Sequence, residues 1–166
     1  MNMNNNDINI IDYIDQPILA VVDDIPQMDE LTRKIFGKNG RFAKSIYKSA
    51  IVQNLSYVYK NKDNKIIAIC LNRYESDENK VEIDIFCVDE NYRKRGLAKK
   101  LLLHSIENCK TKGIYNFCLN VSITNITAIN FYFKFGFKIE RFINDYYPND
   151  SPPDSHAYVM TLNKAE

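Results

Sequence analysis

A basic, glycine-containing turn separates an apolar strand pattern, which ends at Val88, from an amphipathic helix pattern, which begins at Leu97. Unpaired backbone N–H groups at a helix N-terminus bind phosphate oxygens together with the helix dipole, and Gly96 allows the backbone to approach an anion closely. Positive charge is added by Arg93, Lys94, Arg95, Lys99 and Lys100. The pattern predicts a phosphate-binding turn. The alternative is an ordinary strand–helix connection with a solvated basic helix start.

A carboxylate and a phenol are the next groups that could do acid–base chemistry. Glu82 lies on the strand pattern eleven residues before Arg93. A carboxylate in a partly apolar cleft can accept a proton directly or through a water. Tyr132 lies on the inward face of a predicted helix, where a buried phenol needs a polar partner. The alternatives are an exposed strand pair of Glu82 with Asp84, and a core aromatic whose hydroxyl is satisfied.

Hydrophobic periodicity predicts the elements that position these residues. Strands are expected at 18–22, 55–59, 65–74, 81–88, 116–121, 137–142 and 157–162. Helices are expected at 23–36, 42–51, 97–110 and 125–135, and a polar loop at 145–156. Antiparallel strands come first and β-α-β units follow. The order predicts an α/β (α+β) fold with a mixed central sheet of about seven strands and helices on both faces.

Length and composition limit the class of protein. A chain of 166 residues suits one domain. We expect a disordered polar tail over residues 1–15 and a single domain over 16–166. With 22 basic and 21 acidic residues the net charge is +1, which argues against a generic nucleic-acid binder.

Other sequence features bear on location and on metal binding. No apolar run approaches the ~18 residues of a membrane span, and no secretory leader opens the chain, so no membrane partner is expected. The four cysteines lack CxxC spacing and are expected to be buried, reduced thiols of a cytoplasmic protein. His104 is expected on the polar, exposed side of its helix, and His156 has no ligand-spaced partners, so no metal is expected.

Two segments resemble the signature motifs of the GNAT N-acetyltransferase superfamily. Residues 93–98 match the pattern Q/R-x-x-G-x-G/A of its pyrophosphate loop. Residues 125–137 are similar to its segment N-x-x-A-x-x-x-Y-x-x-x-G-F. The two segments occur in the family's order and at a family-like separation, and the resemblance covers roughly residues 18–163.

The resemblance implies that acetyl-CoA is the acyl donor. The strand ending at Val88 would bond the pantetheine arm through its backbone, and a backbone N–H near Cys87 or Val88 would polarise the thioester carbonyl. Tyr132 would lie near the thioester sulfur and protonate the leaving thiolate. The implied CoA-binding residues are Phe86, Cys87, Val88, Arg93, Lys94, Arg95, Gly96, Leu97, Ala98, Lys99, Asn125 and Tyr132.

The resemblance also implies an acceptor site. Glu82 matches the glutamate base of histone-type members, and its side chain would also contact the acceptor. At Asn120, protein N-alpha-acetyltransferases often have His or Glu. Asparagine cannot act as a base, although it can orient a water. Asn120 is therefore a candidate catalytic residue that would position a water.

Residues 144–160 are similar to the closing hairpin of protein N-alpha-acetyltransferases, including the ribosomal-protein-alanine type. In that hairpin a Tyr-Tyr pair, here Tyr146 and Tyr147, clamps the substrate. His156 is a small departure from the family pattern, and a Pro-rich surface loop is the alternative. Phe36 opens the segment that shapes the peptide's first pocket in some relatives, but this chain lacks the proline found there.

Together these features predict an acetyl-CoA-dependent N-acetyltransferase acting on a primary amine. The α-amino group of a protein or peptide is favoured because its reference pKa is ~8, against ~10.4 for lysine, so a modest base suffices. The alternatives are a small-molecule acetyltransferase acting on a polyamine, amino sugar or drug-like amine, and a catalytically weak CoA-binding auxiliary subunit. Association with the ribosome or with an auxiliary subunit is a further expectation.

Overall fold

The structure is a computed structural model that describes residues 12–163. Most of the predicted polar tail, residues 1–11, lies outside the described residues. The last part of that tail is hydrogen-bonded to the end of β2 and to the turn that follows it. The backbone N–H of Ile14 donates to the Lys60 carbonyl at 3.0 Å, and that of Lys62 donates to the Asp12 carbonyl at 3.0 Å.

A seven-stranded mixed sheet forms the centre of the molecule, as the sequence predicts. The strands are β1 (Ile18–Leu19), β2 (Tyr57–Lys60), β3 (Ile66–Glu75), β4 (Lys80–Val88), β5 (Asn116–Ser122), β6 (Lys138–Ile143) and β7 (Ala157–Leu162). Their spatial order is β1-β2-β3-β4-β5-β7-β6. The pairing of β4 with β5 is parallel, and the other pairings are antiparallel.

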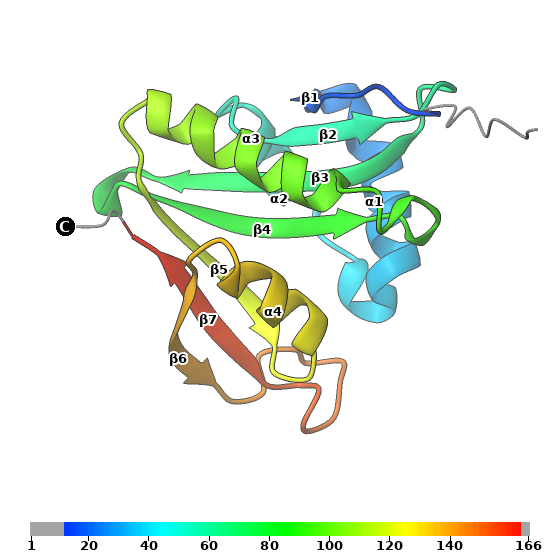
Figure 1. Ribbon diagram of the computed structural model, residues 1–166. Helices are drawn as coiled ribbons and strands as arrows, with labels where there is room; N and C mark the ends of the chain where they lie inside the picture. Colours follow the sequence, from blue (N-terminus) through cyan, green and yellow to red (C-terminus); the bar gives the residue numbers. More distant parts are fainter. Residues whose placement is uncertain (1–11, 164–166) are drawn as a thin grey trace, which may run out of the picture.

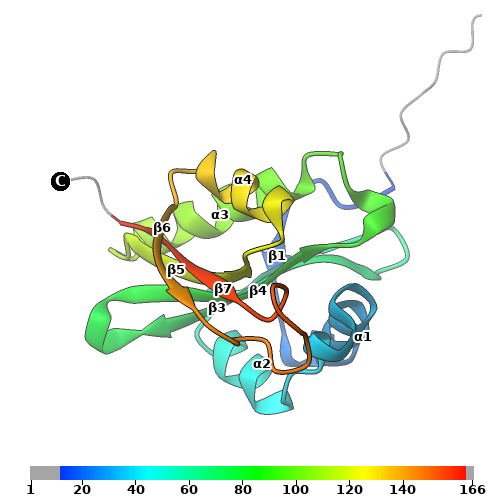
Figure 2. The same ribbon diagram turned by 90° about the horizontal axis from the view of Figure 1, so that it is seen from below.

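Helices cover both faces of this sheet (Figures 1 and 2). They are α1 (Ile25–Phe36), α2 (Lys44–Ile51), α3 (Leu97–Thr111) and α4 (Ile126–Phe133). One core lies under α1 and α2 and includes Met28, Tyr47 and Ile69. The other lies under α3 and α4 and includes Leu101 and Phe117. The predicted element order and the placement of helices on both faces are confirmed.

The first predicted strand is shorter than expected. Residues 18–22 were predicted to form a buried strand, but β1 has only two residues, and Leu19, Val21 and Val22 are exposed. The physical reason is that β1 is an edge strand with β2 as its one strand neighbour, so an apolar run here is not enclosed on both sides. A short 3-10 turn, Val22–Asp24, then leads into α1.

Two irregularities in β4 shape the middle of the sheet. First, its parallel pairing with β5 covers Lys80–Glu82 and goes no further, and the two strands then diverge (Figure 1). Second, Leu71 pairs with Ile85 while Asn72 pairs with Ile83, so Asp84 is the extra residue of a β-bulge. The bulge reverses the alternation of β4, because Ile83 packs in the α3–α4 core and Ile85 in the α1–α2 core.

The cysteines agree with the sequence prediction. All four, Cys70, Cys87, Cys109 and Cys118, are unpaired and buried. Burial raises the pKa of Cys70 and Cys87 to about 12, so these thiols stay protonated at neutral pH. Over residues 12–163 no helix is long and apolar enough to cross a membrane, and no cluster of His, Cys, Asp and Glu could hold a metal ion.

Candidate active site

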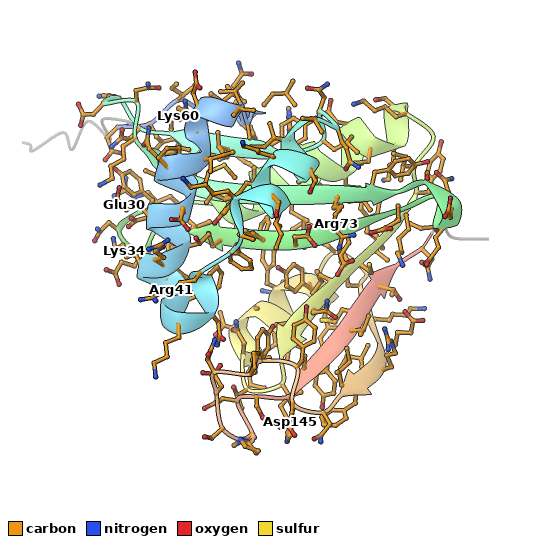
Figure 3. All side chains as sticks on the ribbon, turned by 180° about the vertical axis from the view of Figure 1, so that it is seen from behind. Glu30, Lys34, Arg41, Lys60, Arg73 and Asp145 are labelled. Carbon is orange, nitrogen blue, oxygen red and sulfur yellow. The ribbon has the colours of Figure 1, made fainter. Side chains whose placement is uncertain are left out.

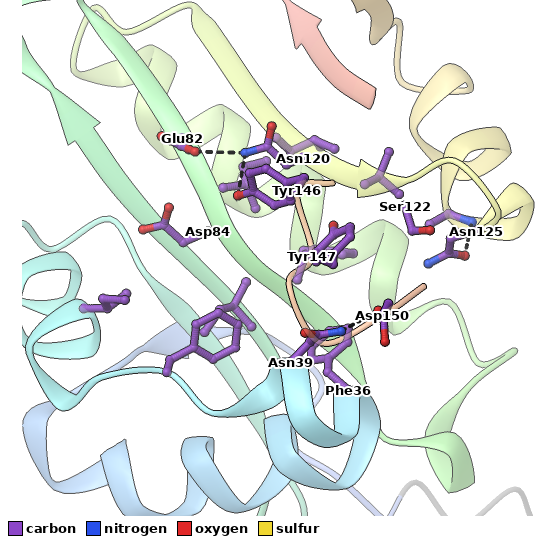
Figure 4. A pocket seen from close by; sticks show the side chains of 18 of the residues that line it. Phe36, Asn39, Glu82, Asp84, Asn120, Ser122, Asn125, Tyr146, Tyr147 and Asp150 are labelled. Atoms are coloured by element: carbon purple, nitrogen blue, oxygen red, sulfur yellow. Dashed lines mark hydrogen bonds between the residues drawn. The ribbon is translucent and has the colours of Figure 1, made fainter. Parts of the chain in front are cut away.

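A cavity of about 640 Å³ opens where β4 and β5 diverge. The end of α1, the N-terminus of α4 and the loop between β6 and β7 complete its walls (Figure 4). The sequence-predicted residues that line it are Phe36, Glu82, Phe86, Asn120, Asn125, Tyr132, Tyr146 and Tyr147. The structure therefore brings together every residue predicted for catalysis or acceptor binding, although they come from five separate parts of the chain.

A hydrogen-bonded network crosses the cavity at Asn120. Its Nδ2 donates to Glu82 Oε1 at 3.2 Å and to the Tyr146 hydroxyl at 3.1 Å (Figure 4). Asn120 lies on β5, Glu82 on β4 and Tyr146 on the β6–β7 loop. The asparagine therefore fixes the candidate base and one wall of the cavity relative to each other.

Arg73 on β3 is a site residue that the sequence interpretation missed. Its Nη2 donates to Glu82 Oε2 at 2.7 Å, and its Nε and Nη2 both donate to the Asp84 carboxylate at 3.1 Å. It also forms an ion pair with Glu75. A signal for this was present, because the polar turn at 75–80 makes a hairpin in which Arg73 lies opposite Glu82.

Glu82 and Asp84 therefore do not form the solvent-facing pair of the alternative interpretation. Both side chains are partly buried and share the Arg73 guanidinium. Burial raises the pKa of the Asp84 carboxyl, and the hydrogen bonds from Arg73 partly oppose that rise. The pocket floor is thus a mixed-charge cluster.

Tyr132 has a buried aromatic ring that packs against Phe86, Phe131 and Phe137. Burial raises its pKa well above the ordinary value of a phenol, so the hydroxyl is protonated at neutral pH. Within residues 12–163 the structure gives this hydroxyl no hydrogen-bond partner, and the residue lines the cavity. The phenol is therefore available to a group that enters the cavity, in contrast to the alternative of a satisfied core tyrosine.

Asn125 is the N-cap of α4. Its Oδ1 accepts a hydrogen bond from the Ala128 backbone N–H at 3.2 Å. This cap stabilises the first turn of the helix that carries Tyr132. The predicted contact of Asn125 with CoA stays a prediction, and the cap is a role that the structure adds.

The loop from residue 144 to residue 156 closes the cavity. Tyr146 and Tyr147 pack edge to face with ring centroids 4.8 Å apart, and burial raises the pKa of Tyr147 to about 12. His156 Nδ1 accepts from the Asp145 backbone N–H at 3.1 Å, so this departure from the family pattern stabilises the turn of the loop. Asn39 donates to Asp150, which joins the loop to the turn after Phe36 across the cavity mouth.

The basic turn has the conformation of an anion-binding helix start. Gly96 is the N-cap of α3 with φ +80°, and no side chain of the described chain caps the first-turn N–H groups. Lys94 is also left-handed, with φ +60°, and Arg93 Nε donates to the Val88 carbonyl at 3.0 Å. Arg95 pairs with Asp12. These residues fit the phosphates of CoA, since they combine positive charge with unpaired amides. Their contacts with CoA stay a prediction.

Comparison with known proteins gives the class of protein. The profile of the Acetyltransferase (GNAT) family matches residues 25–137. N-alpha-acetyltransferase 50 of Danio rerio is 31% identical over 143 residues, which cover 83% of each chain. The chain therefore belongs to the GNAT family and is an acetyltransferase with acetyl-CoA as donor.

Two further comparisons agree with this family. The structure of Arabidopsis thaliana Naa50 in complex with the bisubstrate analogue CoA-Ac-MVNAL superimposes with a TM-score of 0.80 at 26% identity, covering 89% of this chain and 97% of that one. The [ribosomal protein bS18]-alanine N-acetyltransferase of Salmonella typhimurium is 30% identical over 100 residues, covering 60% of this chain and 66% of that protein. The resemblance that the sequence motifs predicted is confirmed.

Proposed function

We propose that the protein transfers acetyl from acetyl-CoA to the α-amino group of a protein or peptide. The observation that carries the proposal is the cavity in which Glu82, Asn120 and Tyr146 form one network and which Tyr132 also lines. The names of two relatives support the same substrate class, since one is an N-alpha-acetyltransferase and the other an N-acetyltransferase of an alanine of a ribosomal protein.

Glu82 is the proposed base. Its carboxylate is held on the cavity wall by Arg73 and Asn120 and accepts a proton from the acceptor ammonium, directly or through a water. An α-amine needs only a modest base because its reference pKa is ~8. Asn120 contributes by orientation, since an amide nitrogen cannot take up the proton.

Acetyl-CoA supplies the activated acetyl group as a thioester, which the amine attacks. Tyr132 is proposed to pass a proton to the leaving thiolate and to regain one from the second N–H that the attacking amine loses; burial keeps its phenol protonated at neutral pH before this step. A backbone N–H near Cys87 or Val88 would stabilise the developing oxyanion. The turn from Arg93 to Lys99 and the N-terminus of α3 would hold the pyrophosphate.

Tyr146 and Tyr147 are proposed to bind the acceptor's first residues. Their rings line the cavity from the β6–β7 loop, and Phe36 lines it from the end of α1. Phenols can bond a peptide backbone and their rings can cover a side chain. Association with the ribosome or with an auxiliary subunit stays a further expectation.

A small polyamine is the second candidate acceptor. The observation in its favour is that three carboxylates, those of Glu82, Asp84 and Asp150, line the cavity. Two of them are already paired with Arg73, which reduces the negative charge available to a polycation. The geometry therefore favours a peptide.

Thiol release from acetyl-CoA across a panel of short peptides and polyamines tests the proposal. We expect turnover with peptides that have a free N-terminus and none with the same peptides N-terminally blocked, with mass spectrometry placing the acetyl group on the α-amine. Turnover with polyamines alone would replace the peptide proposal. No thiol release with any amine would favour the auxiliary-subunit alternative.

A further inference from the structure

Arg73 is the cation that contacts the proposed base. It lies directly opposite Glu82 in the β3–β4 register, and the distance from its Nη2 to Glu82 Oε2 is 2.7 Å. Figure 3 shows it on the sheet face over which α1 and α2 pack. The side chain is one-third exposed, which leaves it at the cavity floor between solvent and the core.

Asp84 fixes the guanidinium in place. Nε and Nη2 of Arg73 donate to different oxygens of the Asp84 carboxylate, which is a two-point contact along the edge of the guanidinium plane. The Asp84 side chain is 13% exposed, less than either partner. Residues two apart in a strand lie on the same face, so Asp84, which is also the extra residue of the β4 bulge, lies beside Glu82.

The two oxygens of Glu82 thus have different partners. Oε2 accepts from Arg73 and Oε1 accepts from Asn120. An ionised carboxylate has about four acceptor positions, so both contacts leave room for an incoming proton while they fix the plane of the group. A lysine could not hold two carboxylates in this way, because it lacks the planar fork of arginine.

We propose that Arg73, anchored by Asp84, is a positioning residue for acetyl transfer that holds the Glu82 carboxylate in its proton-accepting orientation. This inference rests on the proposed function, in which Glu82 is the base. Arg73 itself need not touch the acceptor. The titratable and charged groups that face Glu82 are Arg73 on β3, Lys80 and Asp84 on β4, Cys118 on β5 and Tyr146 on the closing loop. Glu75 on β3 pairs with the same Arg73.

Two single variants separate charge from geometry. Arg73→Lys keeps the charge but loses the fork, so we expect kcat to fall about tenfold because the base is misplaced, with an unchanged KM for acetyl-CoA. In the pH profile of kcat/KM, the low-pH (acid) limb of Arg73→Lys should have the same midpoint as that of the parent protein. Arg73→Gln also removes the charge, so Glu82 and Asp84 become neighbouring carboxylates without a cation. Its acid limb should move to higher pH.

A double variant tests positioning directly. Arg73→Gln with Asp84→Asn removes one positive and one negative charge, so the net charge of the cluster equals that of the parent protein. We expect the acid limb to return toward its original position while kcat stays low. Full recovery of kcat would show that only charge matters and would overturn the proposal. An effect confined to the acceptor KM would also overturn the proposal, because it would mean that Arg73 contacts the substrate.

The control and the choice of acceptor keep this test separate from the proposed function. Arg141→Gln, on the exposed edge strand β6, should leave kcat and the pH profile unchanged. Each variant is assayed with a peptide and with a polyamine. If only the polyamine is acetylated, the peptide proposal fails, but the kinetics of the Arg73 variants still decide the inference.

The contact between Arg73 and Asp84 can also be tested without an activity assay. In a carboxyl-carbon NMR titration, Arg73→Gln should raise the pKa of Asp84, because the hydrogen bonds from Arg73 lower it in the parent protein. An unchanged midpoint would mean that the Arg73–Asp84 contact is not formed in solution, and the proposal would fall.

Discussion

Asn120 on β5 and Glu82 on β4 are joined by a 3.2 Å hydrogen bond from the amide Nδ2 to the carboxylate Oε1. The bond lies at the point where the two strands stop pairing, since Glu82 is opposite Cys118 in the last parallel pair. The strands then diverge and the cavity begins. An amide that cannot act as a base therefore supports a carboxylate that can, at the inner end of the site.

Glu82→Gln should lower kcat by roughly 100-fold, because the amide cannot accept the proton while its size is nearly the same. CoA affinity, measured by calorimetry, should be nearly unchanged, and the acid limb of the pH profile should move or vanish. Glu140→Gln on the exposed strand β6 is the matched control. An unchanged rate would assign the proton to another group or to an ordered water.

Gly96→Glu should abolish CoA binding, since it places a negative charge at the proposed phosphate site and forces a residue with a side chain to φ +80°. Gly96→Ala carries only the conformational strain and should bind CoA more weakly but measurably. Within residues 12–163, a Cβ added at Gly96 meets no heavy atom of the surrounding protein within 4 Å, so crowding inside the protein does not explain a loss. Affinity in the parent protein should also fall with added salt. Unaltered CoA binding by Gly96→Glu would refute the assignment of the turn.

Tyr147→Ala should raise the acceptor KM or lower kcat/KM, with acetyl-CoA binding intact, because it removes one wall of the acceptor cavity. The loss should be larger for a peptide than for a compact amine, which has no backbone to bind. Tyr146→Phe tests the hydroxyl alone, since it keeps the ring and loses the bond from Asn120. Equal losses with both acceptors would contradict the clamp, and no loss with either would make the pair surface packing.

Asn72→Ala should destabilise the fold. Asn72 is fully buried, and its Nδ2 donates to the Leu55 carbonyl and to Ser105 Oγ, each at 2.6 Å. The free energy of unfolding should fall by roughly 2–3 kcal/mol, because buried acceptors lose their donor. Urea unfolding measures the change. The exposed Asn130→Ala should stay within about 0.5 kcal/mol of the parent protein, and a similar value for Asn72→Ala would refute the network's role.

Stability should decrease as the pH rises above 9. Burial raises the pKa of Cys70 from 9.0 to about 12, so between these values the folded thiol keeps a proton that the unfolded thiol has lost. Stability then falls with rising pH, by the linkage of proton binding to folding. Urea unfolding at pH 8, 9 and 10 measures the slope. Cys70→Val should reduce that slope, and an identical slope would show that this thiol is not responsible.

The sequence by itself determined the elements and the family. Apolar spacing is a local property, so it predicted every strand and helix in the right order, including the helix that begins at Leu97. The motifs at 93–98 and 125–137 are also local, because a turn and a helix start need particular residues at fixed spacing. These two segments predict the GNAT family without any information on tertiary contacts, and the family match over residues 25–137 confirms it.

Only the tertiary structure decided how the site is assembled. The Arg73–Glu82–Asp84 cluster depends on the β3–β4 register; the polar turn at 75–80 indicates a hairpin, but it does not fix which side chains lie opposite each other. The bond from Asn39 to Asp150 joins residues more than a hundred positions apart. The short edge strand β1 was misjudged for the same reason. Register, bulges and edges are set by packing between distant segments, and packing is a property of the folded chain.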